Sequence, residues 1–178
     1  MAKLGRGLVH IYTGSGKGKT TAALGQALRA VGAGLRVCMI QFIKGSDTSE
    51  LAAARRLSPE LTILQPAIRP SRIMHTGQPD ARDWEAATCA WHLAEQAMGD
   101  GELDLLILDE INNAVALELV PLDAVLRLLC GRPARLEVVL TGRGAPPELI
   151  AAADLVTEMR EIKHPFRQGI AARRGIEW

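Results

Sequence analysis

A glycine-rich run near the start of the sequence has the residue types that a phosphate-binding loop requires. It comprises Gly14, Ser15, Gly16, Lys17, Gly18, Lys19, Thr20 and Thr21. The glycines let consecutive backbone N–H groups point at a polyphosphate, and a helix that begins directly afterwards favours an anion at its N-terminus. In this pattern Lys19 bridges the outer phosphates and the Thr20 hydroxyl binds Mg²⁺. Thr13 stands where the Walker A pattern has its first glycine. The alternative is an ordinary glycine-rich turn, which the flanking elements disfavour.

An acidic pair, Asp109 and Glu110, follows the most apolar stretch of the sequence, residues 103–108. An apolar strand that ends in carboxylates is where nucleotide-binding α/β folds hold a metal ion, directly or through water. Because side chains alternate along a strand, both carboxylates face the same way only if the strand has ended. We therefore predict Thr20, Asp109 and Glu110 as metal ligands, and the choice of direct ligand between the two carboxylates stays open.

Two cations follow other predicted strands. Lys44 comes after the second strand and Arg143 after the fifth. Open α/β sheets bind their ligands at the carboxyl ends of the strands, so either cation could stabilise phosphate charge. The alternative for each is a solvated surface cation. The four histidines show no metal-ligand spacing and no nucleophile partner, so a hydrolytic triad is not supported.

The elements that must position these residues alternate along the chain. Strands are expected at 8–12, 37–43, 61–64, 103–108, 136–141 and 155–162, and helices at 19–31, 49–57, after Asp80, at 122–129 and at 146–153. Strands that alternate with helices indicate a parallel sheet with helices on both faces. We therefore predict a single α/β domain over residues 1–178, a P-loop fold of RecA-like architecture with a mostly parallel sheet.

Two stretches between and after these elements are expected to be irregular: a long, proline-containing loop at 65–80 and a basic tail at 163–178. In the helix that follows the loop, Trp84, Thr88, Trp91 and Met98 recur at helical spacing. Such a stripe favours packing against the core.

The composition excludes several classes of protein. The chain has 178 residues, of which 48% are hydrophobic and 23% charged, so it is not intrinsically disordered. A net charge of +1 and an aromatic share of 3% argue against a nucleic-acid partner. No apolar run is long enough for a membrane span and no secretion signal is evident. The cysteines Cys38, Cys89 and Cys130 are expected to be buried and reduced, which predicts a cytoplasmic protein.

An ordered set of motifs extends the glycine-rich loop and the acidic pair. The motifs lie at residues 14–23, 29–32, 41–45, 108–110, 141–144 and 163–166. In this order they resemble the ATP:corrinoid adenosyltransferases of the CobA/CobO/BtuR type, from about residue 8 to the end of the sequence. The resemblance implies transfer of the 5′-deoxyadenosyl group of ATP to the cobalt of a reduced, Co(I) corrinoid. Triphosphate is released, and the reaction belongs to adenosylcobalamin biosynthesis or salvage.

The resemblance also implies cofactors, partners and residue roles. ATP and a corrinoid are the substrates, and Mg²⁺ is required. An external reductase of the flavoprotein type reduces the cobalt, since nothing in the sequence resembles a flavin or iron–sulfur site. A homodimer is expected. Lys19 and Thr20 are the expected catalytic residues, and residues 14–21 bind the ATP phosphates. The expected further contacts to phosphate or corrinoid are Arg29, Lys44, His75 and Arg143.

Two other functions stay open on the residues alone. The first is a P-loop ATPase or small-molecule kinase, which would release ADP or transfer the outer phosphate. The second is a non-catalytic module that binds ATP or a corrinoid. The sequence also departs from the family it resembles, whose members usually carry an aromatic pair after the position of Gly77 that helps to remove the lower ligand of cobalt. Here Gln78, Pro79 and Asp80 follow, and Trp84 is the nearest aromatic residue.

Overall fold

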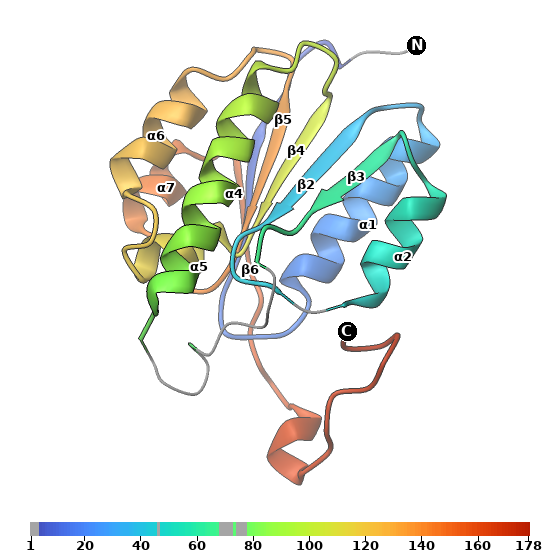
Figure 1. Cartoon of the computed structure of the whole chain (residues 1–178), viewed down its shortest axis with the longest axis vertical. Coiled ribbons are helices and arrows are strands. Elements are labelled where there is room, and N and C mark those ends of the chain that lie inside the picture. Colours follow the sequence, from blue (N-terminus) through green and yellow to red (C-terminus); the bar gives the residue numbers. More distant parts are fainter. Residues whose placement is uncertain (1–3, 46, 68–72, 74–77) are drawn as a thin grey trace.

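Six parallel strands form one sheet in the computed structural model, which describes residues 4–45, 47–67, 73 and 78–178. The strands are β1 (Val9–Thr13), β2 (Val37–Gln41), β3 (Leu61–Leu64), β4 (Leu105–Asp109), β5 (Glu137–Thr141) and β6 (Leu155–Glu158). They lie in the order β3-β2-β4-β5-β1-β6, and each neighbouring pair is parallel (Figure 1). All the strands therefore present their carboxyl ends at one edge of the sheet.

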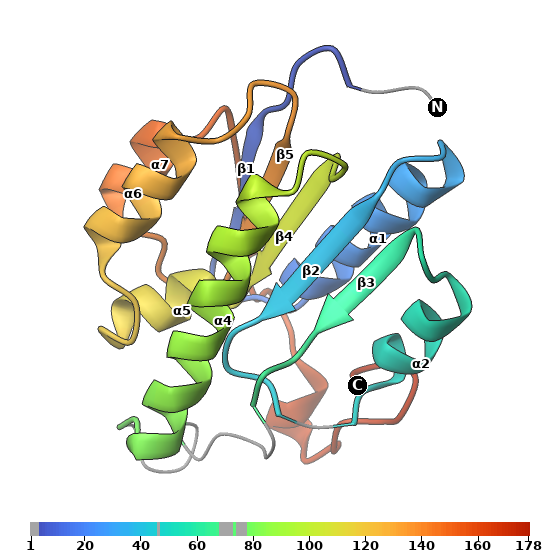
Figure 2. The same cartoon turned by 45° about the horizontal axis from the view of Figure 1, so that its top comes forward.

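Helices cover both faces of this sheet. They are α1 (Lys19–Gly32), α2 (Ser49–Arg56), α4 (Ala81–Gly99), α5 (Ile111–Ala116), α6 (Leu122–Cys130) and α7 (Pro147–Ala152), with a 3₁₀ turn, η1, at Pro165–Gln168. Helices α1 and α2 lie on one face and α4, α6 and α7 on the other (Figures 1 and 2). Within the described ranges, no helix combines the length and the apolar character that crossing a membrane would require.

Side-chain alternation along the strands produces two hydrophobic cores. In β4, Leu106 and Leu108 face the cluster that includes Ala90 of α4, whereas Leu105 and Ile107 face the cluster built around α1. Every residue of β4 is buried, as expected for a central parallel strand covered on both faces. The sheet is therefore a rigid base whose carboxyl edge carries the loops.

The predicted fold class is confirmed, with differences at a few boundaries. Strand β2 ends at Gln41 rather than at residue 43, β4 occupies 105–109 rather than 103–108, and β6 ends at Glu158 rather than at 162. The sequence pattern did not predict α5, because six residues are too few to establish a helical period.

The predicted packing of the stripe on α4 is confirmed for Met98, which is buried, and for Trp91, which packs partly buried against the core, but it is wrong for Trp84 and Thr88. Trp84 is 45% exposed and Thr88 is also exposed, whereas Ala87, Ala90 and Met98 form the buried face of this helix. Ala87, Ala90 and Ala94 are fully buried against the sheet, so Trp84 and Thr88 lie on the solvent side of the helix. The expectation for the cysteines holds for one of three: Cys38 is buried, where desolvation raises the pKa of its thiol to about 11, but Cys89 and Cys130 are exposed.

Candidate functional site

The glycine-rich loop between β1 and α1 lies against the backbone that follows β6. The backbone N–H of Gly16 donates to the carbonyl oxygen of Met159 at 2.7 Å. A Cβ atom on Gly14 or Gly16 would come within 3 Å of the backbone of Met159 or Arg160. Gly14 and Gly18 also have φ of +96° and +113°, a region that L side chains avoid. The glycines are therefore needed both for the close approach and for the loop conformation.

Thr13, which replaces the first glycine of the Walker A pattern, has a structural role in this chain. Its side chain is buried at the end of β1, and its hydroxyl accepts a hydrogen bond from the backbone N–H of Ala145 at 3.2 Å. The hydroxyl thereby ties the start of the glycine-rich loop to the segment that follows β5.

We expect Gly16→Ala to weaken ATP binding while Gly25→Ala does not. The new methyl group at position 16 would lie 2.8 Å from backbone atoms of Met159 and Arg160, so the loop must shift. Gly25 lies on α1 with nothing within 4 Å of its Cβ position, and alanine there is expected to stabilise the helix by about 0.5–1 kcal/mol. Calorimetric titration of both variants with ATP and thermal melts check the prediction. Equal affinity of Gly16→Ala and the unmodified chain would contradict it.

Lys19 is folded into the glycine-rich loop. Its ammonium donates to the carbonyl oxygens of Gly14 and Gly16, each at 2.8 Å, and its side chain is almost fully buried. Burial lowers the pKa of Lys19 below its ordinary value, and the charges of Glu110 and Asp109 oppose this effect. The loop thus holds a desolvated cation where phosphate oxygens can take the place of the two carbonyls.

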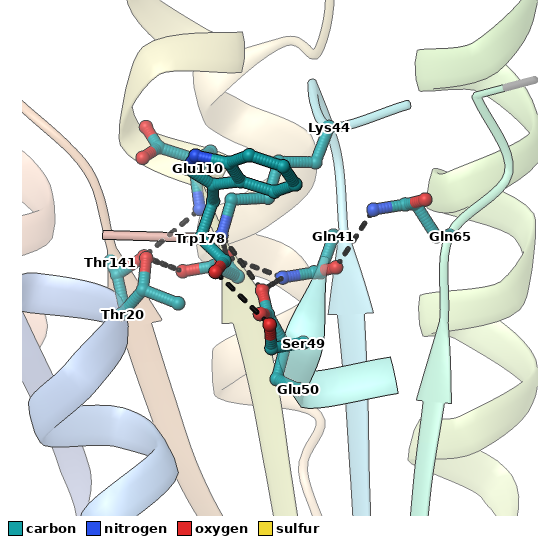
Figure 3. Close-up of polar contacts among 10 residues, drawn as sticks. Thr20, Gln41, Lys44, Ser49, Glu50, Gln65, Glu110, Thr141 and Trp178 are labelled. Atoms are coloured by element: carbon teal, nitrogen blue, oxygen red, sulfur yellow. Dashed lines mark hydrogen bonds and ion pairs between the residues drawn. The ribbon is translucent and has the colours of Figure 1, made fainter. Parts of the chain in front are cut away.

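Asp109 is the residue that connects the polar network at the strand ends, and Figure 3 labels its partners Thr20, Gln41, Lys44 and Thr141. It is fully buried, and its Oδ1 accepts from the hydroxyls of Thr20 at 2.8 Å and Thr141 at 2.6 Å. Its Oδ2 accepts from Nε2 of Gln41 at 3.1 Å and lies 3.7 Å from the Lys44 ammonium. Asp109 therefore connects the first residues of α1 with the ends of β2 and β5.

Glu110 lies directly beyond the strand, in a left-handed conformation with φ of 64°. The backbone N–H of Glu110 donates to the Thr141 hydroxyl at 2.9 Å. Glu110 also borders the pocket that the glycine-rich loop lines. Burial and the neighbouring charge of Asp109 raise the pKa of Glu110, while Lys44, Lys19 and Arg143 act in the opposite direction. The strand has thus ended between the two carboxylates, which meets the condition for both to serve one site.

These groups surround a pocket of about 650 Å³ at the carboxyl edge of the sheet. The predicted site residues that line it are Ser15, Gly16, Lys17, Gly18, Lys19, Thr20, Thr21, Lys44, Glu110 and Arg143. Lys44 also contacts Glu50 at 3.2 Å. A pocket of this volume, with lysines on a glycine-rich loop and carboxylates opposite, fits a metal-bound nucleoside triphosphate.

Among the described residues, the predicted site residues Gly14, Arg29 and Asp109 do not line this pocket, although Gly14 and Asp109 contact Lys19 and Thr20, which do. Arg29 lies in the last turn of α1, on an exposed part of the helix, and in the described part of the chain it does not line the pocket. It is ten positions after Lys19 on the same helix, which corresponds to about 15 Å along the axis. His75 lies outside the described residues.

Several residues that line the pocket were not predicted. They are Leu24, Ile43, Gly45, Ser49, Glu50, Asn113, Glu161 and His164, together with residues 175–178. Glu50 lies in the first turn of the helix after β2, a position at the binding edge that the sequence pattern could have indicated. The position of residues 175–178 depends on how the irregular tail folds back, which no local pattern specifies.

Comparisons with known proteins agree with the geometry. The profile of the family described as ATP:corrinoid adenosyltransferase BtuR/CobO/CobP matches residues 5–178. A corrinoid adenosyltransferase of Pseudomonas aeruginosa is 41% identical, over 97% of this chain and 84% of the relative. A corrinoid adenosyltransferase of Escherichia coli is 38% identical and one of Salmonella typhimurium 37%, each over 97% of this chain and 86% of the relative.

Proposed function

The chain belongs to the ATP:corrinoid adenosyltransferase family, and from this premise we propose how its site performs the transfer. The enzyme moves the 5′-deoxyadenosyl group of ATP to the cobalt of a reduced corrinoid. The Co(I) centre of the substrate supplies the electron pair of the new cobalt–carbon bond. The bond between C5′ of ATP and its phosphate oxygen breaks, and its electron pair leaves with triphosphate.

The site supplies positioning and charge rather than a base. Because the cobalt substrate is itself the nucleophile, no proton has to be removed from an attacking group. The chain must hold ATP in place and neutralise the leaving triphosphate. Lys19 is buried in the loop where the phosphates bind, and Lys44 and Arg143 border the same pocket. We assign these three cations to charge neutralisation and Thr20 to the organisation of the triphosphate end.

The oxygen atoms that Thr20 and Glu110 present at the pocket are of the kind that binds Mg²⁺. The described residues contain no cluster of three or more His, Cys, Asp and Glu side chains that would form a complete metal cage. Mg²⁺ is usually held by one or two carboxylates together with substrate phosphates and water. The Thr20 hydroxyl, which donates to Asp109 at 2.8 Å, and Glu110 at the pocket provide such a partial set of hard oxygen ligands. Mg²⁺ held there would neutralise charge on the triphosphate.

The observation that carries the proposed function is the conjunction of a nucleotide pocket with family membership over residues 5–178. The pocket alone would equally serve an ATPase or a kinase. Incubation with ATP, Mg²⁺ and chemically reduced corrinoid tests the difference, with chromatography of the products. We expect triphosphate and an adenosylated corrinoid. ADP with free phosphate would instead support an ATPase, ADP with a phosphorylated acceptor would support a kinase, and binding without any product would support a non-catalytic module.

The same proposal includes the cellular setting of the enzyme. We propose that an external reductase of the flavoprotein type supplies Co(I), that the protein acts as a homodimer in the cytoplasm, and that the product serves adenosylcobalamin biosynthesis or salvage. Addition of a flavoprotein reductase to the oxidised corrinoid assay and measurement of mass in solution test these points.

We expect a preference for corrinoids that lack a lower base when a protein reductant is used. Reduction of cobalt is easier once the lower ligand has left, and apolar rings that fill the lower face promote its departure. Gln78, Pro79 and Asp80 offer no such ring. The exposed Trp84 lies on α4 among residues of a separate surface hollow that includes Cys89.

Initial rates with cobalamin and cobinamide measure this preference. With a protein reductant, cobinamide should react faster, and with chemically pre-reduced corrinoids the difference should shrink because the ligand has already left. Equal rates for both corrinoids under the protein-coupled condition would contradict the prediction.

A further inference from the structure

Residues 175–178, which we call the strap, fold back across the nucleotide pocket. The Lys17 ammonium lies 3.5 Å from the Glu177 carboxylate and donates to the backbone oxygen of Ile176 at 3.4 Å. On the other side of the pocket, the Ser49 hydroxyl at the start of α2 donates to the backbone oxygen of Trp178 at 3.1 Å. The strap therefore bridges the glycine-rich loop and α2, and Figures 1 and 2 both show this part of the chain beside α2.

The strap has a defined shape of its own. The side chain of Arg173 donates to both carboxylate oxygens of Glu177 at 3.2 Å, and the backbone N–H of Arg173 donates to Glu177 at 2.8 Å. These hydrogen bonds, together with Lys17, lower the pKa of Glu177 to about 2. Gly175, with φ of +77°, allows the turn. The strap thus presents Trp178 from a preformed turn.

The pocket has both polar and apolar lining residues. The glycine-rich loop, Lys44 and Glu110 supply polar groups suited to phosphates and a metal ion. Leu24, Ile43, Ile176 and Trp178 supply the apolar lining. Trp178 lines the same pocket as Glu110 and Lys44, and Figure 3 draws the three side chains together. ATP offers both kinds of surface, because its triphosphate is highly charged and its purine base has a planar, apolar face.

We propose that Trp178 is a substrate-binding residue whose indole stacks on the nucleobase of ATP. This inference rests on the proposed function, since it takes ATP as the bound substrate. Stacking of a base on an aromatic side chain changes the affinity for the nucleotide by about tenfold. Such stacking does not select one base over another, because every base has a π-face. The pocket volume, about 650 Å³, admits a nucleotide.

The strap could also oppose ATP binding, because Glu177 places a carboxylate beside Lys17. A strap that occupied the phosphate position would weaken ATP binding. The Lys17 side chain is 45% exposed, however, and exposed ion pairs contribute little. We therefore expect the stacking of Trp178 on the base to favour ATP binding by more than the competition of Glu177 with phosphate for Lys17 opposes it.

Calorimetric titration with ATP and with inorganic triphosphate, both with Mg²⁺ and without corrinoid, tests the proposal. In Trp178→Ala the Kd for ATP should rise about tenfold, and Trp178→Phe should recover most of the loss. Inorganic triphosphate has no base, so its Kd should stay unchanged. Trp84→Ala is the matched control, because Trp84 is 45% exposed against 44% for Trp178 but lies outside the pocket.

Intrinsic fluorescence gives a second readout. The chain has three tryptophans, and ATP should quench emission in the unmodified chain and in Trp84→Phe but not in Trp178→Phe. An unchanged or tighter Kd for ATP in Trp178→Ala would overturn the proposal, as would an equal loss for ATP and triphosphate. None of these measurements requires adenosyl transfer, so a failure of the proposed reaction would be seen separately, in the product assay.

Discussion

Lys19→Ala is expected to abolish adenosyl transfer while leaving the fold intact. The Lys19 ammonium is held inside the glycine-rich loop by the carbonyl oxygens of Gly14 and Gly16. There it can balance the negative charge that develops on triphosphate as the C5′–O bond breaks. Loss of one such preorganised contact costs on the order of 10² or more in rate. Single-turnover assays with chemically reduced corrinoid measure the effect without involving the reductase.

Lys17→Ala is the matched control for this variant. It removes a lysine from the same loop, but the Lys17 side chain is 45% exposed and pairs with Glu177 of the strap. We expect a much smaller loss of rate than for Lys19→Ala. Near-normal turnover in Lys19→Ala, with unchanged circular dichroism, would remove the glycine-rich loop from the proposed mechanism.

Glu110→Gln is expected to raise the Mg²⁺ concentration required for activity more than Asp109→Asn does. Glu110 borders the pocket, whereas both Asp109 oxygens already accept hydrogen bonds within the protein. Loss even of a residue that only orients a metal ligand lowers metal affinity by about 10–100-fold, so loss of a ligating carboxylate should cost at least as much. Metal titrations of the rate at saturating ATP measure this shift. Identical Mg²⁺ dependence of both variants and the unmodified chain would assign the acidic pair a structural role.

Asp109→Asn should instead show its larger effect in stability. An amide at this fully buried position cannot accept from the hydroxyls of Thr20 and Thr141 and from Gln41 as the carboxylate does. A buried donor left without an acceptor costs about 1–3 kcal/mol. Urea unfolding of Asp109→Asn and Glu110→Gln compares the two free energies of unfolding, and the smaller value is expected for Asp109→Asn.

The loop and the acidic pair could be predicted from sequence because their chemistry depends on residues that lie close together in the chain. The glycines, Lys19 and Thr20 form one local motif, and Asp109 with Glu110 ends one apolar strand. The parallel order of strands then brings these two segments to one edge. The fold class followed from the same alternation of strands and helices.

The remaining features depend on tertiary structure. The outward position of Trp84 is set by the alanines that face the sheet on the same helix, which a hydrophobic period alone does not distinguish. Arg29 belongs to a motif next to the glycine-rich loop in sequence, yet the length of α1 carries it away from the pocket. Trp178 reaches the pocket through a turn in an irregular tail.

The central claim is that cobalt attacks C5′ of ATP and that all three phosphates leave together. Reaction of ATP labelled with ¹³C at C5′ and chemically reduced corrinoid, followed by ¹³C NMR and phosphate analysis, tests it most directly. We expect the labelled carbon to be bonded to cobalt, with triphosphate formed in equal amount. Label retained in ADP or in a phosphorylated acceptor, with no cobalt-bound carbon, would contradict the proposed reaction.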